Sequence, residues 1–501
     1  MALRFTSVLG ISIAMVVSLL GCEERKAPEP AARVSPPEPA PPPEAPSAAP
    51  PPEPTPRGPA EPLNVLLITI DSLRADMPWT GYPRPIAPNL TELANDSVVY
   101  PRAYSASSYT AKSVATLLTG RFASTLYRDG YFFAKYSSAN LFFPEILSER
   151  GIASFSWHAH LYFQRGKGLD QGFTEWRLVP GITFNPNTDE HVTSEKMTKL
   201  GIELLDNPKL TDGQFFAWAH YMDPHDQYVK HEESPDFGRK NRDRYDSEVW
   251  HTDYWVGKLL EFARQKPWWK KTVLIVSADH GEAFGEHGMY KHAFEVWEVL
   301  TRVPLIVHGG GITPRRIEQR RSHIDLAPTI LELMKVPVPD GMQGKSLVPE
   351  LYGAEPESRE PILVELAEDS HNPPRRALIS GRYKIIDFGR NRFELYDLEA
   401  DPGEEKNLAK ELPEELARMR ALLAEKYATL PTVAPYGGMK LREGGIARGP
   451  SGPPKTPESA PKAAASGSAA APSPPKNAER APAAATSGAA ALSPAAPAAS
   501  E

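Results

Sequence analysis

Two apolar runs far apart in the chain lack polar alternation and end at acidic residues. Residues 64–70, NVLLITI, are followed by Asp71, and residues 272–276, TVLIV, lead into SADHGEAFGEHG, which contains Asp279 and His280. Continuous apolar, β-branched runs are typical of strands in a parallel sheet, because helices cover both of its faces. Ligands of such sheets bind beyond the carboxyl ends of the strands. We therefore expect these three side chains to meet at one edge of a sheet.

Between and after these two runs, strands and helices are predicted to alternate. Apolar runs predict strands over residues 153–157, 214–220 and 302–308. Periodicity and composition predict helices over residues 89–94, 111–118, 142–150, 245–265 and 325–333. Strands that alternate with helices indicate an α/β fold with a central, mostly parallel sheet flanked by helices.

The pattern changes from about residue 361. Short runs separated by Gly and Asn turns predict a small antiparallel sheet over residues 362–366, 377–380, 383–388 and 392–396. The apolar face of a closing helix is marked by Leu416, Met419, Leu423 and Tyr427. We predict that residues 63–350 form the main α/β domain and that residues 351–432 form a C-terminal subdomain of the same fold.

Composition sets the two ends of the chain apart from this folded part. Many of the 53 prolines among the 501 residues lie near the ends. Residues 22–62 are rich in Pro, Ala and Glu and predict a disordered spacer, and residues 433–501, rich in Ala, Pro and Ser, predict a disordered tail. The net charge of -7 comes from mixed acids and bases. No basic stripe with interleaved aromatic residues appears, which argues against a nucleic-acid partner.

The N-terminal segment predicts export. Arg4 precedes a short apolar stretch at residues 8–20, and the segment ends in LLGC, which resembles a bacterial lipobox. Residues 1–21 would then be a lipoprotein signal peptide, and Cys22 would carry the lipid. An ordinary secretory signal with a chance cysteine is the alternative. Because Cys22 is the single cysteine, no disulfide can form within the chain. We expect a lipid-anchored protein of the bacterial cell envelope that faces the periplasm or the exterior.

The expected sheet edge carries ligands suited to a metal ion. An aspartate beside a histidine, as in Asp279-His280, supplies one hard oxygen and one imidazole nitrogen, a set that suits Mn²⁺, Zn²⁺, Mg²⁺ or Fe²⁺. Asp71 at the end of a second strand strengthens this interpretation. A polar loop that merely caps a strand is the alternative.

A hydroxyl group stands near the start of one predicted helix. Thr110 precedes the helix expected over residues 111–118. Free backbone N–H groups and the positive end of the helix dipole favour an alkoxide and an anionic substrate at that position. Threonine is also a common N-cap, worth ~1 kcal/mol. The local sequence leaves both roles open.

Four segments in this order resemble the sulfatase family of the alkaline-phosphatase superfamily. They are NVLLITIDSLRAD, VATLLTGR, VSADHGEAFGEHG followed by RVPLIVHGGG, and ELYDLEADPGEEKNLA. The likeness runs from about residue 64 to residue 408. It implies the sandwich fold of that superfamily and a hydrolase or transferase that acts on sulfate or phosphate esters. It also implies one divalent metal ion, which would be Ca, Mg, Mn or Zn.

The resemblance assigns roles to residues by their position in these segments. It implies a metal site made of Asp71, Thr110, Asp279 and His280, with Thr110 also at the position of the family's nucleophile. It implies that the oxygens of the sulfuryl or phosphoryl group contact His225, Lys291, Lys112 and His292. His292 or His225 would protonate the leaving oxygen.

The chain also departs from the sulfatase pattern. Sulfatases have a cysteine or serine that becomes formylglycine, then proline two residues on and arginine four residues on; this chain has Thr110, Lys112 and Val114. Threonine cannot form that aldehyde. Ser72 stands where a second aspartate is usual, and His280 stands where sulfatases often have asparagine. These residues are closer to phosphoryl-transferring relatives, such as phosphoglycerol or phosphoethanolamine transferases and phosphodiesterases.

Three functions remain open on these grounds. The first is single-metal ester chemistry at Thr110. The second is a two-metal phosphodiesterase, which would recruit Asp223, His225 and His292 around another ion. The third is a non-catalytic lipoprotein that binds an anion or a glycan. The expected partner is a sulfated or phosphorylated small molecule, glycan or lipid headgroup, together with the membrane that holds the anchor. The sequence does not indicate an oligomeric state.

Overall fold

The computed structural model describes residues 58–182, 192–436, 438–440 and 446–448. The predicted signal peptide, the lipidation site Cys22 and most of the spacer at residues 22–62 lie outside the described residues. So does the tail from residue 449 onward. The first part of the predicted tail makes defined contacts, because the N–H of Val433 donates to Ser124 O at 2.8 Å and that of Tyr436 donates to Arg128 O at 2.9 Å.

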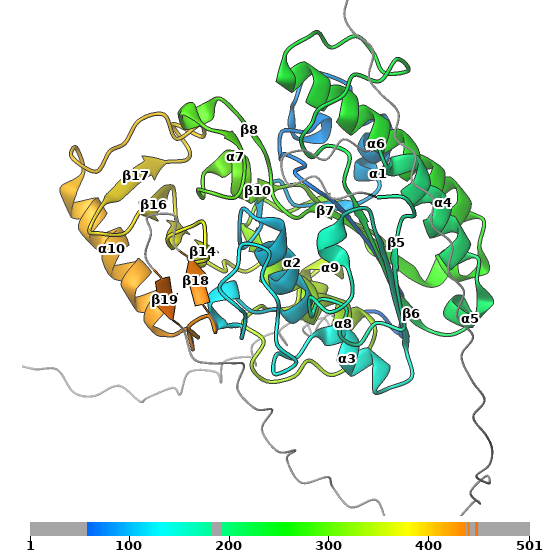
Figure 1. Cartoon of the computed structure of the whole chain (residues 1–501). Coiled ribbons are helices and arrows are strands. Elements are labelled where there is room, and N and C mark those ends of the chain that lie inside the picture. Colours follow the sequence, from blue (N-terminus) through cyan, green and yellow to red (C-terminus); the bar gives the residue numbers. More distant parts are fainter. Residues whose placement is uncertain (1–57, 183–191, 437, 441–445, 449–501) are drawn as a thin grey trace, which may run out of the picture. The chain divides into compact units, whose positions relative to one another are not determined.

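A sheet of eight strands forms the centre of the fold (Figure 1), in the order β12-β2-β11-β7-β1-β6-β4-β5. Strands β7, β1, β6, β4 and β5 run parallel to one another, whereas β11 is antiparallel to β7. The mixed, mostly parallel sheet confirms the predicted fold class. In sheet order the strands are β12 (Arg315–Arg316), β2 (Val98–Val99), β11 (Leu305–Gly309), β7 (Thr272–Ala278), β1 (Asn64–Ile70), β6 (Phe215–Tyr221), β4 (Ala153–His158) and β5 (Glu175–Leu178).

Helices cover both faces of this sheet (Figure 1). One face carries α1 (Pro88–Asn95), α4 (Ser194–Leu205) and α6 (Asn241–Arg264). The other carries α2 (Thr110–Thr119), α3 (Phe143–Ser148), α8 (Leu326–Leu333) and α9 (Val348–Leu351). Short helices α5 (Pro208–Thr211) and α7 (Glu298–Thr301) lie in connections. All seven residues of β1 and of β7 are buried, as expected for strands covered on both faces. No helix within the described ranges is long and apolar enough to cross a membrane.

The strand expected over residues 302–308 is divided in the structure. Its first part, β10 (Arg302–Val303), pairs with β3 (Ala103–Tyr104), and β3 pairs with β13 (Arg321–Ser322) in a small separate sheet. Its second part, β11, joins the central sheet. Pro304 stands between the two parts and has no N–H to donate to a ladder. The single-strand prediction is therefore wrong at this proline.

The predicted C-terminal antiparallel sheet is confirmed. It pairs β14 (Ile362–Leu366), β15 (Arg375–Ser380), β16 (Tyr383–Asp387) and β17 (Phe393–Asp397) in sequence order, and α10 (Pro413–Ala428) packs on it. Met419 and Leu423 of α10 belong to the same buried cluster as Leu378 and Ile385 of the sheet. Two further hairpins pair β8 (Ala283–Phe284) with β9 (Tyr290–Lys291) and β18 (Gly438–Lys440) with β19 (Ile446–Arg448).

The register of the central strands determines where chemistry can occur. Ile70 of β1 lies opposite Ala278 of β7 and opposite Tyr221 of β6. The residues that follow these strands therefore leave the sheet at the same level. Asp71 and Asp279 are 208 positions apart in the sequence, and the parallel pairing brings them to the same edge of the sheet.

Candidate active site

The two strand-end aspartates are neighbours at the carboxyl edge of the sheet. Both side chains are fully buried. Oδ1 of Asp279 accepts hydrogen bonds from the N–H of Ser72 at 3.3 Å and from the N–H of His280 at 2.9 Å. Ser72 has a left-handed backbone with φ of 57°, and its hydroxyl donates to Oδ1 of Asp71 at 2.9 Å. Ser72 thus supports Asp71 from the position where the resemblance leads one to expect a second carboxylate.

Thr110 lies against this pair as the first residue of α2. Its Oγ1 is 3.3 Å from Oδ2 of Asp71 and 3.1 Å from Nε2 of His280. Tyr109, the N-cap, has an extended backbone and makes no side-chain capping bond. The N–H groups of Lys112 and Ser113 are the first to donate within the helix, both to Tyr109 O. The N–H of Thr110 comes before them and is not used in the hydrogen bonds of the helix. The structure brings together Asp71, Thr110, Asp279 and His280, as the sequence predicts.

Two buried carboxylates this close oppose each other's ionisation. Burial raises the pKa of Asp71, but the hydrogen bond from His220 and the nearby His225 and His280 outweigh it and hold that pKa well below its usual range. Burial and the charge of Asp71 raise the pKa of Asp279 well above its usual range. Oδ2 of Asp279 is buried and has no hydrogen-bond partner among the described residues. A cation between the carboxylates would satisfy this oxygen and offset the repulsion.

His280 has the geometry of a metal ligand. Its Nδ1 lies 2.9 Å from the carbonyl oxygen of Gly281, which favours a proton on Nδ1 and leaves the Nε2 lone pair free. Nε2 points toward the carboxylates, 3.3 Å from Oδ2 of Asp279 and 3.7 Å from Oδ1 of Asp71. Burial and the neighbouring His292 lower the pKa of His280 to about 3, so the imidazole is neutral at pH 7. The residues present therefore fit a divalent metal ion.

The sequence did not reveal one further residue at this cluster, His220. Three ligand atoms lie within 4.8 Å of one another, one each from Asp71, His220 and Asp279. Nε2 of His220 is 3.2 Å from Oδ2 of Asp71, and its Nδ1 is 2.8 Å from Oγ1 of Thr69. The sequence does contain a signal for this residue, because His220 is a polar residue at the end of the apolar run 214–220. That run forms β6, which pairs directly with β1, the strand before Asp71.

Two of the predicted substrate-contacting histidines lie beside the cluster. The ring of His292 is 4.2 Å from the ring of His280 and 5.0 Å from the ring of His225, centroid to centroid. Nδ1 of His292 is 3.1 Å from Oε1 of the buried Glu282. Burial lowers the pKa of His292, but Glu282, Asp71 and Asp226 together outweigh it and raise that pKa.

Lys291 borders the cluster from a hairpin. It ends β9 with a left-handed backbone of φ 67°, and its side chain is 51% exposed. Its Nζ lies 2.5 Å from Oδ2 of Asp226, the residue that follows His225. The lysine and the two histidines therefore lie on facing loops at the same edge of the sheet.

Lys112, the remaining predicted substrate contact, is buried in an ion pair. Its ammonium group is fully buried, pairs with Asp369 from the loop after β14, and lies 5.0 Å from the ring of Tyr109. Burial lowers the pKa of Lys112, and Asp369 opposes that shift. The side chain thus joins α2 to the C-terminal sheet.

We expect Lys112→Met to lower the free energy of unfolding by about 3–5 kcal/mol, because it leaves the Asp369 carboxylate buried without its cation. Urea denaturation measures this loss. The double variant Lys112→Met/Asp369→Asn keeps acceptors for the N–H groups of His371 and Asn372, which bond to Asp369 at 2.8 Å and 2.9 Å, and should recover part of it. Equal stabilities of the single and double variants would contradict this account.

Contacts outside the cluster brace the loop after β7. Arg74 donates to the carbonyl oxygen of Glu282 at 2.7 Å and to Oε1 of Glu286 at 2.8 Å. His287 stacks on Trp297 with centroids 3.8 Å apart. Both Glu286 and His287 are thus used in loop structure.

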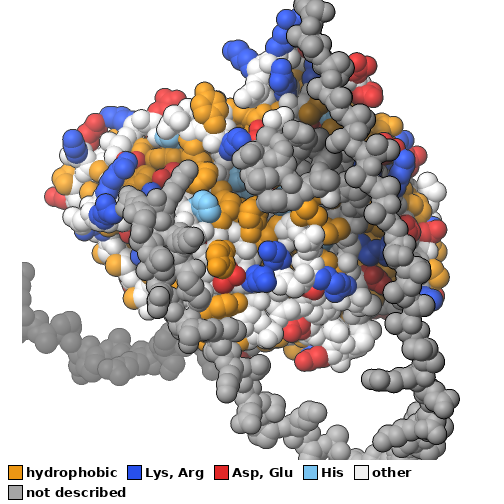
Figure 2. Space-filling model, in the orientation of Figure 1, with side chains coloured by type: hydrophobic (Ala, Val, Ile, Leu, Met, Phe, Trp, Pro, Cys, Tyr) orange, Lys and Arg blue, Asp and Glu red, His pale blue; other side chains and the backbone are white. Residues whose placement is uncertain are grey.

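Aromatic side chains adjoin the start of α2. Tyr109 stacks on Phe132 at 4.2 Å, and Phe132 lies 6.4 Å from Phe294 and 4.9 Å from His371. Phe294 is 42% exposed. Figure 2 shows hydrophobic side chains with histidine side chains among them in the middle of this face. An apolar or ring-shaped group could pack on this aromatic wall next to Thr110.

Comparisons with known proteins point to one family. Residues 63–336 match the family described as Sulfatase, and residues 285–430 match the family described as N-sulphoglucosamine sulphohydrolase, C-terminal. The chain is 25% identical over 427 residues to the choline-sulfatase of Rhizobium meliloti (strain 1021), covering 69% of this chain and 82% of the relative.

Solved structures show the same fold. A 2-O GAG sulfatase aligns with a TM-score of 0.62 and 21% identity, covering 75% of this chain and 95% of the other. A phosphonate monoester hydrolase from Silicibacter pomeroyi aligns with a TM-score of 0.59 and 19% identity, covering 77% and 99%. Because the Sulfatase match spans more than half of the chain, and the strand-end cluster lies within it, this chain belongs to the sulfatase family of the alkaline-phosphatase superfamily, a family of hydrolases that act on sulfate esters.

Proposed function

We propose that this chain is a metal-dependent enzyme that cleaves sulfate or phosphate esters with Thr110 as its nucleophile. The observation that carries the proposal is the position of Oγ1, 3.3 Å from Asp71 and 3.1 Å from His280 at the N-terminus of α2. An isolated threonine hydroxyl is a weak nucleophile and needs a partner that lowers its pKa.

Asp71, Asp279 and His280 would hold the metal ion, with His220 at its border. When bound, a divalent cation lowers the pKa of a hydroxyl and polarises a sulfuryl or phosphoryl oxygen. The chain's own groups perform the remaining work. Asp71 orients the Thr110 hydroxyl and accepts its proton. The free N–H groups and dipole of α2 favour negative charge on the ester oxygens.

The reaction then proceeds in two balanced steps. Oγ1 of Thr110 forms a bond to sulfur or phosphorus while the bond to the leaving oxygen breaks, and His292 or His225 gives that oxygen a proton. Glu282 holds the ring of His292 in place for this transfer. In the second step water attacks sulfur or phosphorus and the bond to Oγ1 breaks. Oγ1 takes back the proton held by Asp71, and one proton of the water goes to the histidine, which restores both groups. An acceptor alcohol in place of water would make the same site a transferase.

A panel of aryl esters tests the proposal. Purified protein supplied with Mn²⁺, Ca²⁺ or Zn²⁺ is assayed on an aryl sulfate, an aryl phosphate and a bis-aryl phosphate. The aromatic wall around Phe132 suits such substrates. We expect turnover of at least one class, and the preferred ester distinguishes sulfate from phosphate. No turnover of any ester, with tight binding of an anionic glycan, would favour the non-catalytic alternative.

The two-metal alternative receives less support. Asp223, which that scheme needs as a ligand, caps α4 instead. Its carboxylate accepts the N–H of Thr193 and the N–H of Ser194, both at 2.7 Å, and the hydroxyl of Thr193. These bonds use both oxygens, so the geometry favours one ion at the catalytic cluster.

We expect Lys291→Ala to lower kcat/KM by about 10- to 100-fold, because an ammonium donor near the ester oxygens is lost. Steady-state kinetics on the preferred ester measures the effect. The exposed Lys209→Ala, in the connection before β6, is a matched control and should behave as wild type. A Lys291 variant with unchanged kcat/KM would show that the Asp226 contact is its whole role.

We also propose that Cys22 anchors the protein to a membrane of the bacterial envelope, with the folded part facing the periplasm or the exterior. The LLGC motif and the spacer at residues 22–62 support this. Expressed with its signal, wild type should partition with membranes and incorporate labelled palmitate. Cys22→Ser should lose the label, and a labelled Cys22→Ser protein would refute the anchor.

A further inference from the structure

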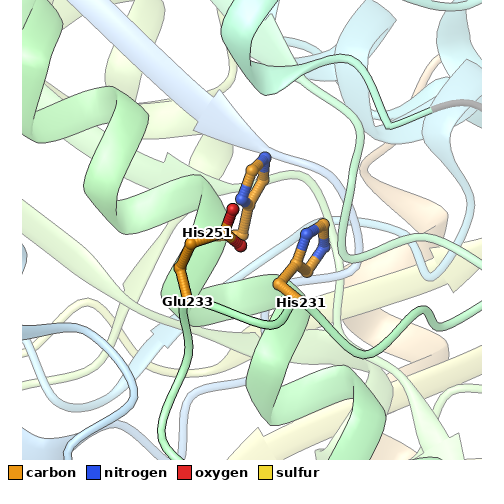
Figure 3. Close-up of side chains that lie close together, drawn as sticks. All are labelled: His231, Glu233 and His251. Carbon is orange, nitrogen blue, oxygen red and sulfur yellow. The ribbon is translucent and has the colours of Figure 1, made fainter.

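A second group of metal-binding side chains lies away from Thr110, between a loop and a helix. His231 and Glu233 belong to the connection from β6 to α6, and His251 belongs to α6 (Figure 3). One ligand atom from each of the three lies within 4.8 Å of the others. His231 is buried, His251 is half-buried and Glu233 is exposed, so an ion could reach the group from solvent.

His231 is fixed in the manner of a metal ligand. Its Nε2 lies 2.8 Å from Oε2 of Glu248, and its backbone N–H donates to Oγ of Ser247 at 2.8 Å. Glu248 is itself held, because its Oε1 accepts the N–H of Val229 at 2.7 Å. Histidine ligands of metals commonly donate their other ring N–H to a carboxylate, which fixes the tautomer and orients the ring. Burial raises the pKa of Glu248 to about 10 in the metal-free protein. A proton on Nε2 of His231, donated to the ionised Glu248, would leave the lone pair on Nδ1 for an ion.

The ring of His251 lies against that of His231 and carries an unsatisfied nitrogen. Its ring stacks on that of His231, with centroids 3.8 Å apart and planes 9° apart. Nε2 of His251 is buried and has no hydrogen-bond partner in the part of the chain that the structure describes. An unpaired buried polar atom costs about 1–3 kcal/mol. Because the two rings are stacked face to face, binding of a common ion requires the His251 ring to turn out of the stack. Figure 3 shows Glu233 beside the two histidines.

We propose that His231, Glu233 and His251 bind a second divalent transition-metal ion, separate from the one at the catalytic cluster. Two imidazoles and one carboxylate form a ligand set that suits Zn²⁺, whereas Ca²⁺ and Mg²⁺ prefer oxygen ligands alone. The ion would tie the connection that carries His225 and Asp226 to α6. It is thus a structural site that stabilises one wall of the active site.

The test removes the first ion before looking for the second. Metal-free Asp279→Asn protein is titrated with Co²⁺, whose d–d absorption reports ligand type, and with Zn²⁺ by calorimetry. We expect one equivalent to bind in this background, with a rise in Tm on adding Zn²⁺. His251→Ala in the same background should abolish both signals. Because the readout is binding to a protein without catalytic activity, it stays separate from the proposed ester chemistry.

Two further variants keep the test decisive if His251→Ala folds poorly. Glu233 is exposed, so Glu233→Gln should fold normally and weaken Zn²⁺ binding at least tenfold. The adjacent, exposed Glu232→Gln is the matched control and should bind as the parent does. No bound equivalent in the Asp279→Asn parent, or binding that Glu233→Gln leaves unchanged, would overturn the proposal.

Discussion

Thr110→Ala is expected to lower kcat/KM on the preferred ester by about 10³-fold or more, with the fold intact. The hydroxyl would make the new bond to sulfur or phosphorus, and alanine offers no atom that can replace it. The γ-methyl and hydroxyl groups are small, so the loss of stability should stay near 1–2 kcal/mol. Steady-state kinetics and a thermal melt on the same preparation separate loss of chemistry from loss of fold.

Two other hydroxyl variants serve as controls for this result. Thr110→Ser keeps an oxygen at the same place and should restore most of the rate. Ser108→Ala removes a hydroxyl two residues away that donates to the carbonyl oxygen of Glu295, and it should stay within tenfold of wild type. Mass spectrometry after incubation with substrate should find the adduct on Thr110. A Thr110→Ala protein as active as wild type would exclude the nucleophile.

Asp279→Asn is expected to abolish activity and yet stabilise the metal-free protein. The variant loses a proposed metal ligand, so we expect kcat/KM to fall by about 10³-fold or more. In the absence of the ion, the wild-type protein buries Asp279 beside Asp71 with one carboxylate oxygen unpaired, which raises the pKa of Asp279, whereas the amide cannot ionise at all. We therefore expect the free energy of unfolding of the metal-free protein to rise by about 1 kcal/mol.

Thermal melts with and without a chelator test both halves of this expectation. The chelator should lower the Tm of wild type more than that of Asp279→Asn, because only wild type has the catalytic ion to lose. Without metal, the variant should melt at or above the wild-type temperature. A variant that keeps its activity would show that Asp279 is not a ligand. A metal-free variant that melts well below wild type would show that Asp279 has a structural role of its own.

The strands that carry the site could be predicted from sequence because their signal is local. The run before Asp71 is apolar at nearly every position, and β1 begins and ends where the pattern does. Parallel pairing then made the meeting of Asp71 and Asp279 a consequence of geometry. The start of α2 near Thr110 followed in the same way, from helical composition that ends at Gly120, a left-handed C-cap with φ of 62°.

What the sequence did not reveal depends on partners distant in the chain. His220 looks like the polar end of an apolar run until the register places it next to Thr69 and Asp71. The counterion of Lys112 is Asp369, 257 positions later, so position alone suggested a substrate contact where the structure shows a buried ion pair. Helix α4 was not predicted, although Met197, Leu200 and Leu204 mark its buried face at helical spacing.

The buried pairing of Lys112 with Asp369 has a consequence for how the chain can be divided. Asp369, which pairs with Lys112 in the helix of the proposed nucleophile, comes from the far side of the predicted boundary at residue 350. A truncated product lacking the last third would retain every proposed ligand and the proposed nucleophile, but the buried Lys112 ammonium group would have lost its carboxylate partner. Proteolytic removal of the chain after about residue 350 would therefore be expected to inactivate the protein and not to release a smaller active enzyme.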